Sequence, residues 1–384
     1  MNTNAVLYIG SFNFNKGNAS SIRVIENALF IKQFQLDVHV LGVIDNNSEI
    51  ETIPINNIRE QKGKPFDTNI ESVIKTHNEL KLIYSKVFII AYNYPPVAFY
   101  KLIQFSKKNK IQLVADITEW YAFQGDKNIY SVIRWALNEW KMRFLLKKCY
   151  HFIFATSYLE YLFESKNIVI MPFVTSRASK KISLIKHNNN VVYTYAGSPG
   201  HNFAKDRLDI IIMAFLELKK KSNTFIFNVI GIHNDFSEDK KINKLIKALG
   251  NNIKFYGRLT HEKTVQIIKQ SDYLVFARDL SRMTKVGFPT KVFEAFKYNI
   301  PVITNDTSDL SNYISSENGI LLKENSVKAF FNAFIKIDSD KSIKILHKKN
   351  ISKSNPFRSE NFEREFSVFL EKIYKSESNI SRFD

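Results

Sequence analysis

The sequence predicts an α/β fold in which two parallel-sheet domains of similar size face each other across a cleft. Short apolar runs rich in Val, Ile and Phe alternate with helix-length segments, as in sheets whose strands are buried on both faces. This alternation stops in the polar stretch 176–190, which ends in three Asn, and then restarts. The length of 384 residues also suits two or three domains at roughly 150 residues each.

The first half contains six predicted strands with helices between them, which predicts a doubly wound domain over 1–180. Helix-length segments include 20–34 and 131–148. Residues 176–190 form the best linker in the chain. The predicted strands cover 5–11, 36–43, 87–93, 112–118, 151–157 and 167–173.

The second half repeats the pattern and predicts a second domain over 190–355. Residues 356–384 follow as a helix, predicted at 361–376 to pack back on the first domain, and a tail. In such sheets ligands bind at the carboxyl ends of the strands, so the cleft is the expected site. The predicted strands cover 191–198, 225–232, 252–259, 272–278, 300–306 and 319–323, and the helices 204–221, 238–249, 261–270 and 289–298.

Composition excludes several classes of protein. A hydrophobic content of 45% excludes a disordered chain, and 12 Gly with 9 Pro exclude collagen-like sequence. The single Cys149 excludes a disulfide framework and favours a reducing compartment. No apolar run reaches about 18 residues and the start lacks a charged, apolar leader, so a cytoplasmic protein is expected. The net charge of +18 points to nucleic acid, an anionic membrane surface or a phosphate-rich substrate.

The stretch 286–306 carries the strongest binding signal. Pro289 suits a first helical position, and Thr290 and Lys291 then lie in the first turn, where free N–H groups attract anions. Glu294 follows Lys291 by three residues, and the rise from Pro289 to Glu294 is roughly 7.5 Å, about the span from a diphosphate to a ribose. The alternative is an ordinary exposed Lys291–Glu294 pair on an amphipathic helix.

A second binding signal lies in 194–218. Gly197 and Ser198 form a turn that leads into a helix start with Lys205 and Arg207 nearby, an arrangement able to hold an anion. The alternative is an ordinary strand-to-helix loop with a basic helix face.

Both stretches resemble the donor-binding segments of family 4 glycosyltransferases, which have the GT-B fold of two Rossmann-like domains. In that family two glutamates spaced E-x7-E precede a G-x-PVI strand. Glu294 matches the second glutamate and 299–303 resembles the strand, whereas Val286 stands where the first glutamate would be. The form GFPTK…E resembles a variant of capsule and surface-polysaccharide transferases.

The resemblance implies roles for individual residues. Lys205 matches a lysine that grips the donor diphosphate, and Ser198 stands where an arginine often lies. In 10–29, Gly17 matches the glycine of the family's first loop, with Arg23 on the next helix. The implied donor site comprises Gly17, Gly197, Ser198, Lys205, Arg207, Arg278, Arg282, Pro289, Thr290, Lys291 and Glu294.

The segment 114–121 resembles an acceptor-side segment of the same enzymes. It makes Asp116 and Glu119, together with Lys205, the candidate catalytic residues: the carboxylates would orient the acceptor hydroxyl and Lys205 would stabilise the leaving diphosphate. The alternative for Asp116 and Glu119 is a carboxylate that caps the next element.

The implied function is a retaining glycosyltransferase of the hexosyltransferase type (EC 2.4) that builds a surface polysaccharide. The donor is a nucleotide sugar, and the acceptor is a glycan or a polyprenyl-diphosphate-linked molecule. No metal or other cofactor is expected, because the D-x-D triplet at 338–340 does not follow a predicted strand. Two alternatives stay open: an epimerase-like enzyme that modifies nucleotide sugars, and a basic nucleic-acid-binding protein. Dispersed basic residues and the lack of a known module disfavour binding of nucleic acid.

The segment 131–150 suggests a contact with an anionic membrane, which would place the protein at the inner face of the cell membrane. Trp and basic residues together suit a membrane interface, and the alternative is a core helix with a solvated basic side. The predicted apolar stripe is Ile133, Leu137, Trp140 and Phe144, with Arg134, Lys141, Arg143, Lys147 and Lys148 around it.

Overall fold

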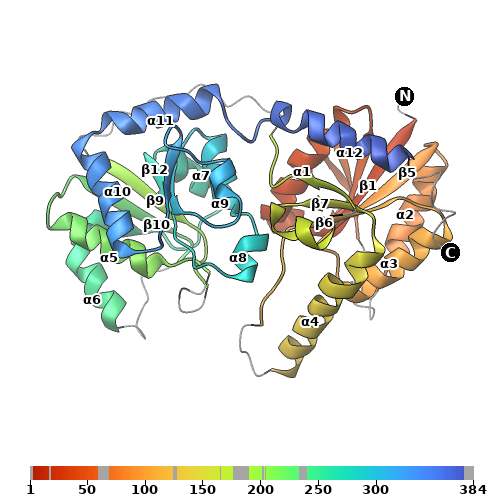
Figure 1. Ribbon diagram of the computed structural model, residues 1–384, viewed down its shortest axis with the longest axis horizontal. Coiled ribbons are helices and arrows are strands. Elements are labelled where there is room, and N and C mark those ends of the chain that lie inside the picture. The colour runs from red at the N-terminus through yellow and green to blue at the C-terminus, as the bar shows by residue number, and fades with distance from the viewer. Residues whose placement is uncertain are drawn as a thin grey trace. The chain divides into compact units, whose positions relative to one another are not determined.

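The chain forms two compact α/β units, each built on its own sheet (Figure 1). Unit 1 comprises Met1–Ser176, Lys285–Phe288 and Arg358–Asp384, and unit 2 comprises Arg177–Thr284 and Pro289–Phe357. The computed structural model describes residues 3–16, 19–58, 69–123, 128–164, 166–175, 190–200, 203, 205–232 and 240–375.

The sheet of unit 1 has the strand order β3-β4-β2-β1-β5-β6-β7-β8 and is parallel except for the antiparallel pair β3 and β4. The central strand β1 is continuously apolar from Ala5 to Ile9, and all five of these side chains are buried, as expected for a strand covered on both faces. The strands are β1 (Asn4–Asn13), β2 (Asp37–Val43), β3 (Ser48–Ile50), β4 (Ile53–Asn57), β5 (Lys86–Tyr92), β6 (Leu113–Ile117), β7 (His151–Phe154) and β8 (Asn167–Ile170).

The helices of unit 1 include the last helix of the chain, α12 (Glu363–Lys375). It packs on this unit through Phe366, which contacts Phe30 and Phe34, and through the Phe369 carbonyl, which accepts a hydrogen bond from Asn167. The predicted packing of the C-terminal helix on the first domain is therefore confirmed. The other helices are α1 (Ala19–Lys32), α2 (Glu71–Lys81), α3 (Pro96–Lys108) and α4 (Ile129–Trp140), which continues as a π-helix, Lys141–Leu145, and a 3-10 turn, Leu146–Lys148.

The sheet of unit 2 is fully parallel, in the order β11-β10-β9-β12-β13-β14. Its strands are β9 (Val191–Ala196), β10 (Phe225–Ile230), β11 (Ile253–Phe255), β12 (Tyr273–Val275), β13 (Val302–Asn305) and β14 (Gly319–Leu322). Its helices are α5 (Leu208–Lys219), α6 (Lys240–Leu249), α7 (His261–Lys269), α8 (Arg282–Val286), whose last two residues group with unit 1, α9 (Thr290–Lys297), α10 (Val327–Ser339) and α11 (Ser342–Lys353).

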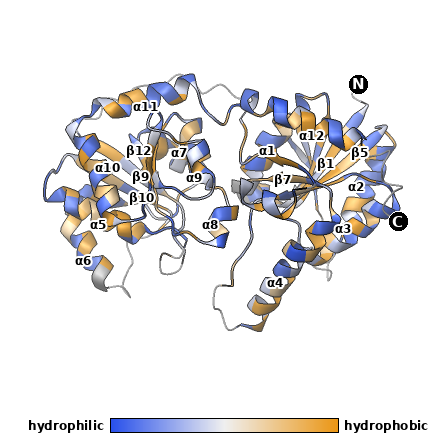
Figure 2. Ribbon diagram, viewed as in Figure 1, coloured by the Kyte–Doolittle hydropathy of each residue, from blue (hydrophilic) through white to orange (hydrophobic). Residues whose placement is uncertain are grey.

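An aromatic core fills unit 2. Phe215 of α5 stacks on Phe334 of α10 with ring centroids 4.2 Å apart, and Tyr193 of β9 contacts both rings. Figure 2 shows apolar residues gathered on the strands and on the sides of the helices that face them. This packing fixes the strand ends that carry the polar residues described below.

Several predicted elements differ from the observed ones. The strand predicted at 252–259 ends at Phe255, and the helix predicted at 204–221 begins only at Leu208. Four residues assigned to the second domain, 285–288, group instead with unit 1, where Val286 joins the hydrophobic core and Thr156 donates a hydrogen bond to its carbonyl. Helical periodicity cannot reveal such a crossing, because it depends on long-range packing.

Candidate functional site

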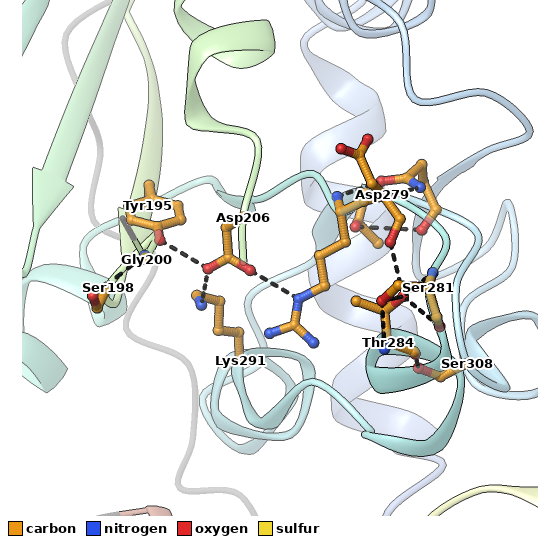
Figure 3. Close-up of polar contacts among 12 residues, drawn as sticks. Tyr195, Ser198, Gly200, Asp206, Asp279, Ser281, Thr284, Lys291 and Ser308 are labelled. Atoms are coloured by element: carbon orange, nitrogen blue, oxygen red, sulfur yellow. Dashed lines mark hydrogen bonds and ion pairs between the residues drawn. The ribbon is translucent and has the colours of Figure 1, made fainter. Parts of the chain in front are cut away.

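A buried carboxylate, Asp206, binds three polar side chains in unit 2. Its Oδ2 accepts hydrogen bonds from Lys291 Nζ at 2.7 Å and from the Tyr195 hydroxyl at 2.8 Å, and its Oδ1 accepts one from Arg278 Nε at 2.8 Å. Figure 3 shows the Asp206 carboxylate between Tyr195 and Lys291. Asp206 is 0% exposed, and Lys291 and Arg278 are 7% exposed each. Residues distant in sequence thus form one buried polar group.

This cluster lies where the strand order of unit 2 reverses. Tyr195 is on β9, Asp206 lies between β9 and α5, and Arg278 follows β12. From β9 the chain continues to β10 on one side, whereas its other neighbour, β12, comes later in the chain. In open parallel sheets such a switch point, at the carboxyl ends of the strands, is where ligands bind.

The electrostatics of the cluster leave one positive charge in excess. Burial alone would raise the pKa of Asp206, but the charges of Lys291 and Arg278 outweigh it and hold this pKa well below its ordinary value. Burial lowers the pKa of Lys291, and Asp206 offsets part of this effect. One carboxylate against two cations gives a net charge of about +1, which suits an anionic ligand.

Gly197, which follows β9, packs directly against this cluster. Its φ of +143° is one that residues with a side chain rarely adopt, and a Cβ placed there would lie 2.8 Å from Lys291 Nζ. A Cβ on Gly231 would in turn lie 2.3 Å from the Gly197 carbonyl oxygen. Two loops therefore approach backbone to backbone at this edge of the sheet.

The basic residues predicted on the same loop have different surroundings. Lys205 is exposed and lies just before α5. Arg207 instead binds Asp209 and Asp279, both at 2.8 Å, which occupies its guanidinium. Ser198 accepts a hydrogen bond from the Gly200 N–H at 3.5 Å. Of these predicted residues, Lys205 is the one whose exposed charge is open to a ligand.

The helix α9 presents the other predicted group. Pro289 is the N-cap rather than the first helical residue, so the helix begins one position later, at Thr290. Lys291 is buried and turned to Asp206, so the exposed Lys291–Glu294 pair that the sequence allowed does not form. Within the part of the chain that the structure describes, the half-buried Glu294 carboxylate has no hydrogen bond or ion pair. Burial raises the pKa of Glu294, and Lys291 and Lys297 offset part of this rise.

Two further predicted donor residues are not part of the cluster. Arg282 is the first residue of α8, outside the group around Asp206. Gly17 lies outside the described residues. The structure therefore brings together Gly197, Arg278 and Lys291, and the Asp206 that joins them was not predicted. The sequence held only a weak signal for it, an acidic residue between Lys205 and Arg207.

The acceptor-side candidates lie in unit 1. Asp116 is 0% exposed, binds Arg23 at 2.6 Å and accepts a hydrogen bond from the Tyr8 hydroxyl. The Arg23 guanidinium also donates to the carbonyls of Met171 and Pro172, so this pair joins α1 to three strand regions. Asp116 therefore serves the packing of unit 1, and its role toward an acceptor stays a prediction.

Glu119 follows β6 and accepts a hydrogen bond from the Tyr121 hydroxyl. The neighbouring loop is fixed by two reciprocal bonds, in which Asn93 Nδ2 donates to Thr118 Oγ1 and the Thr118 N–H donates to Asn93 Oδ1. Glu119 thus follows an ordered strand end of the parallel sheet, where its predicted contact with an acceptor remains a prediction.

The predicted basic patch at 131–150 needs one correction. Lys141 is only 5% exposed and donates to the Tyr94 carbonyl at 3.2 Å, so it is not a surface charge. Burial lowers the pKa of Lys141 to about 8. The stripe is also only partly placed as expected, because Ile133 and Phe144 are exposed whereas Trp140 packs toward the core.

Around the start of α4 the structure instead exposes several large apolar side chains. Figure 1 shows α4 extending away from the sheet of unit 1. Arg134, Lys147 and Lys148 are exposed nearby in the sequence. The exposed apolar side chains are Tyr121, Phe123, Ile129, Tyr130, Ile133 and Trp135.

Two further features of the described residues concern metals and membranes. Among the described residues, no three His, Cys, Asp or Glu side chains come close enough to hold a metal ion. In the D-x-D triplet, Asp338 accepts from Thr224 and Ser222, and Asp340 accepts from Ser342. No helix in the described ranges is long and apolar enough to span a bilayer.

Comparisons with known proteins agree with this architecture. Residues 177–354 match the model of the family "Glycosyl transferases group 1". No curated protein matches the sequence. Among solved structures, the sucrose-phosphate synthase of Thermosynechococcus elongatus superposes with a TM-score of 0.67 at 14% identity, over 97% of this chain and 99% of that one.

Two other structures are similar over nearly their whole length. HepE of Anabaena in complex with UDP-glucose gives a TM-score of 0.62 at 15% identity, over 96% of this chain and 99% of that one. WaaG, a glycosyltransferase involved in lipopolysaccharide biosynthesis, gives 0.61 at 13% identity, over 95% and 98%. At these identities the likeness shows the fold alone. The chain thus has the two-domain α/β fold of the GT-B glycosyltransferases, and its residues 177–354 are similar to the glycosyl transferases group 1 family.

Proposed function

We propose that the protein is a retaining glycosyltransferase that transfers a sugar from a nucleotide sugar to a glycan or lipid-linked acceptor in the synthesis of a surface polysaccharide. The observation that carries this proposal is the buried cluster of Arg278 and Lys291 on Asp206, with its excess positive charge at the switch point of a group 1 domain. Among the similar structures, HepE of Anabaena binds UDP and UDP-glucose, and WaaG is involved in lipopolysaccharide biosynthesis.

The proposed donor site combines the cluster around Asp206 with two residues close to it in the sequence, Lys205 and Glu294. A nucleoside diphosphate gains negative charge as it leaves the sugar, and fixed cations stabilise that charge without reorganising at the moment of reaction. In the proposal Lys205, exposed before α5, supplies this charge together with Arg278 and Lys291 of the cluster. Glu294, three residues beyond Lys291 on α9, binds the ribose hydroxyls with a carboxylate that has no partner among the described residues.

The proposal assigns the charge stabilisation to side chains and therefore expects activity without a metal ion. The acceptor would bind at the carboxyl edge of the unit 1 sheet, where Glu119 follows β6. Glu119 would orient its hydroxyl, and we assign no protein nucleophile.

A panel of UDP-, GDP-, ADP- and CDP-sugars, screened by thermal shift, tests the proposal, because a bound donor raises stability by mass action. With the best donor, Lys205→Ala should lower kcat by roughly two to three powers of ten. Glu294→Gln should weaken nucleotide binding about ten- to a hundredfold with folding intact. Lys254→Ala, which removes an exposed lysine on β11, is the matched control. Wild-type behaviour of both site variants would refute the donor site.

The same assay separates enzyme classes. A transferase consumes the donor in step with glycosylated acceptor, whereas an epimerase-like enzyme converts the donor without any acceptor. Conversion of the nucleotide sugar into an isomer in the absence of acceptor would replace the proposed reaction while leaving the donor site in place.

We also propose that the exposed region around α4 contacts an anionic membrane. Apolar side chains with cations nearby are typical of interfacial segments, and each basic residue contributes about 1 kcal/mol near an anionic surface. Co-sedimentation with phosphatidylglycerol vesicles tests this idea: Lys147→Glu with Lys148→Glu should weaken binding at least tenfold. The matched control reverses Lys372 and Lys375 on α12. Equal loss in both double variants would indicate a general charge effect and refute a site at α4.

A further inference from the structure

The cluster in unit 2 contains a carboxylate where the proposed ligand is an anion, which needs an explanation. Asp206 repels a diphosphate, yet it lies fully buried between two cations. Removing one partner of a buried ion pair leaves the other charge uncompensated in the protein interior. We propose that Asp206 is a positioning residue that holds the Arg278 and Lys291 side chains in place for a diphosphate, an inference that rests on the proposed function.

Arg278 shows how this positioning works. Its Nε donates to Asp206 Oδ1 at 2.8 Å, and its backbone N–H and carbonyl are both bound by the Asn305 side chain. Among the described residues the two terminal nitrogens of its guanidinium have no hydrogen bond. The Arg278 guanidinium is therefore held through Nε, and its two terminal nitrogens remain to donate hydrogen bonds to a ligand with two anionic oxygens.

Lys291 depends on Asp206 for its charge. Its ammonium group is buried beside Gly197 and over the rings of Tyr195 and Phe276. Burial lowers the pKa of Lys291, Arg278 and Lys205 lower it further, and Asp206 is the group that opposes this shift. The Asp206 carboxylate thereby keeps a second cation in the site, one that burial alone would tend to neutralise.

Asp206→Asn separates this role from simple charge balance. The variant keeps the shape of the side chain but removes one negative charge, so a charge count alone predicts tighter binding of an anion. Positioning predicts the opposite: the Kd for the nucleoside diphosphate that wild type binds best, among UDP, GDP, ADP and CDP, should rise tenfold or more. Isothermal titration calorimetry measures this Kd.

The pH dependence adds a readout that a purely structural role would not change. Without Asp206 the pKa of Lys291 falls, so as the pH rises the affinity of the variant should begin to drop at a lower pH than the affinity of wild type. Titration of the nucleotide phosphate is common to both proteins and cancels in the comparison. The groups that face Lys291 are Asp206, Arg278, Tyr195, Lys205 and Glu294.

Asp272→Asn is the matched control. Asp272 is also a buried aspartate of unit 2 bound by two cations, Lys344 and Lys348, but it lies at the start of β12, at the opposite edge of the sheet. Its variant should lose stability while the nucleotide Kd stays within about twofold of wild type. Asp206→Asn with Lys291→Met, which leaves no unpaired lysine, serves if Asp206→Asn does not fold.

The outcomes distinguish a failure of the proposed function from a failure of the role proposed for Asp206. If wild type binds none of the nucleotides, the proposed function fails and this inference fails with it. If wild type binds but Asp206→Asn binds equally or more tightly, the inference alone is overturned. If the double variant is the one that folds, binding of the nucleotide as tight as in wild type overturns the inference, and binding weakened beyond Lys291→Met alone supports it.

Discussion

Replacing Gly197 with alanine should destabilise unit 2 by about 2–4 kcal/mol. A side chain at its φ of +143° costs about 1–2 kcal/mol. The new Cβ would lie 2.8 Å from Lys291 Nζ, about 0.6 Å below the 3.4 Å at which ordinary contact begins. The ammonium group must then move away, which stretches its 2.7 Å bond to Asp206 and loses part of a charged hydrogen bond worth about 1.5–3 kcal/mol.

Urea unfolding of Gly197→Ala measures this cost, and Gly250→Ala is the control. Gly250 also has a positive φ, +55°, but a Cβ placed there would have Lys219 Nζ as its nearest neighbour, 3.6 Å away. It should therefore show only the backbone cost, about 1–2 kcal/mol. If Gly197→Ala loses no more free energy of unfolding than Gly250→Ala, the close packing of Gly197 on Lys291 does not constrain this site.

Three further predictions address other features. Burial lowers the pKa of Lys141 to about 8, from an ordinary 10.5. Between these two pH values the unfolded chain binds more protons than the folded one, so the free energy of unfolding should rise with pH. Lys141→Met should remove this rise and add roughly 3 kcal/mol to the free energy of unfolding at pH 7, as measured by urea unfolding at both ends of this pH range. Asp116→Asn should cost about 3–5 kcal/mol because it leaves the buried Arg23 unpaired, and a change below 1 kcal/mol would argue against a structural ion pair. Transferase activity should survive EDTA; complete loss that Mn²⁺ or Mg²⁺ restores would contradict side-chain stabilisation of the leaving group.

Most strands were predictable because a strand buried on both faces of a sheet has apolar residues at nearly every position. Largely apolar runs such as 191–196 indicate a strand covered on both faces, and β9 begins at the predicted residue, Val191, but ends two residues earlier than predicted. The hairpin of β3 and β4 escaped prediction, since β3 is a short, largely polar strand at the edge of the sheet and β4 buries only Ile53 and Ile55. An edge strand is only partly covered, so it lacks the continuous apolar run from which the other strands were predicted.

The cluster around Asp206 was predictable only in part. Gly197, Arg278 and Lys291 were named from the resemblance and from helix-terminus chemistry, whereas Asp206 was missed. An aspartate near a helix start normally indicates a cap or a solvated charge. What makes Asp206 different is the convergence of Arg278 and Lys291 from segments 72 and 85 residues away, and long-range convergence has no local sequence signal.

Lys141 illustrates the converse error. Among neighbours such as Arg143 and Lys147 it looked like one more surface cation, but it lies on the buried side of this helical stretch together with Asn138, Met142 and Leu145. The basic run therefore predicted a positively charged surface but not which of its basic residues are exposed.

The composition of unit 1 from three separate chain segments has a consequence for biosynthesis. The rings of Phe30 and Phe34 are covered by Phe366 of α12, which emerges from the ribosome only after unit 2 is complete. At about 5–20 residues per second, translation of residues 177–357 takes about 10–40 s. Throughout that time the nascent first unit lacks its last helix, and until residue 286 has been made it also lacks the Val286 side chain of its core. The unit that is synthesised first is thus the one that finishes folding last, and a chaperone would find these aromatic rings uncovered in the meantime.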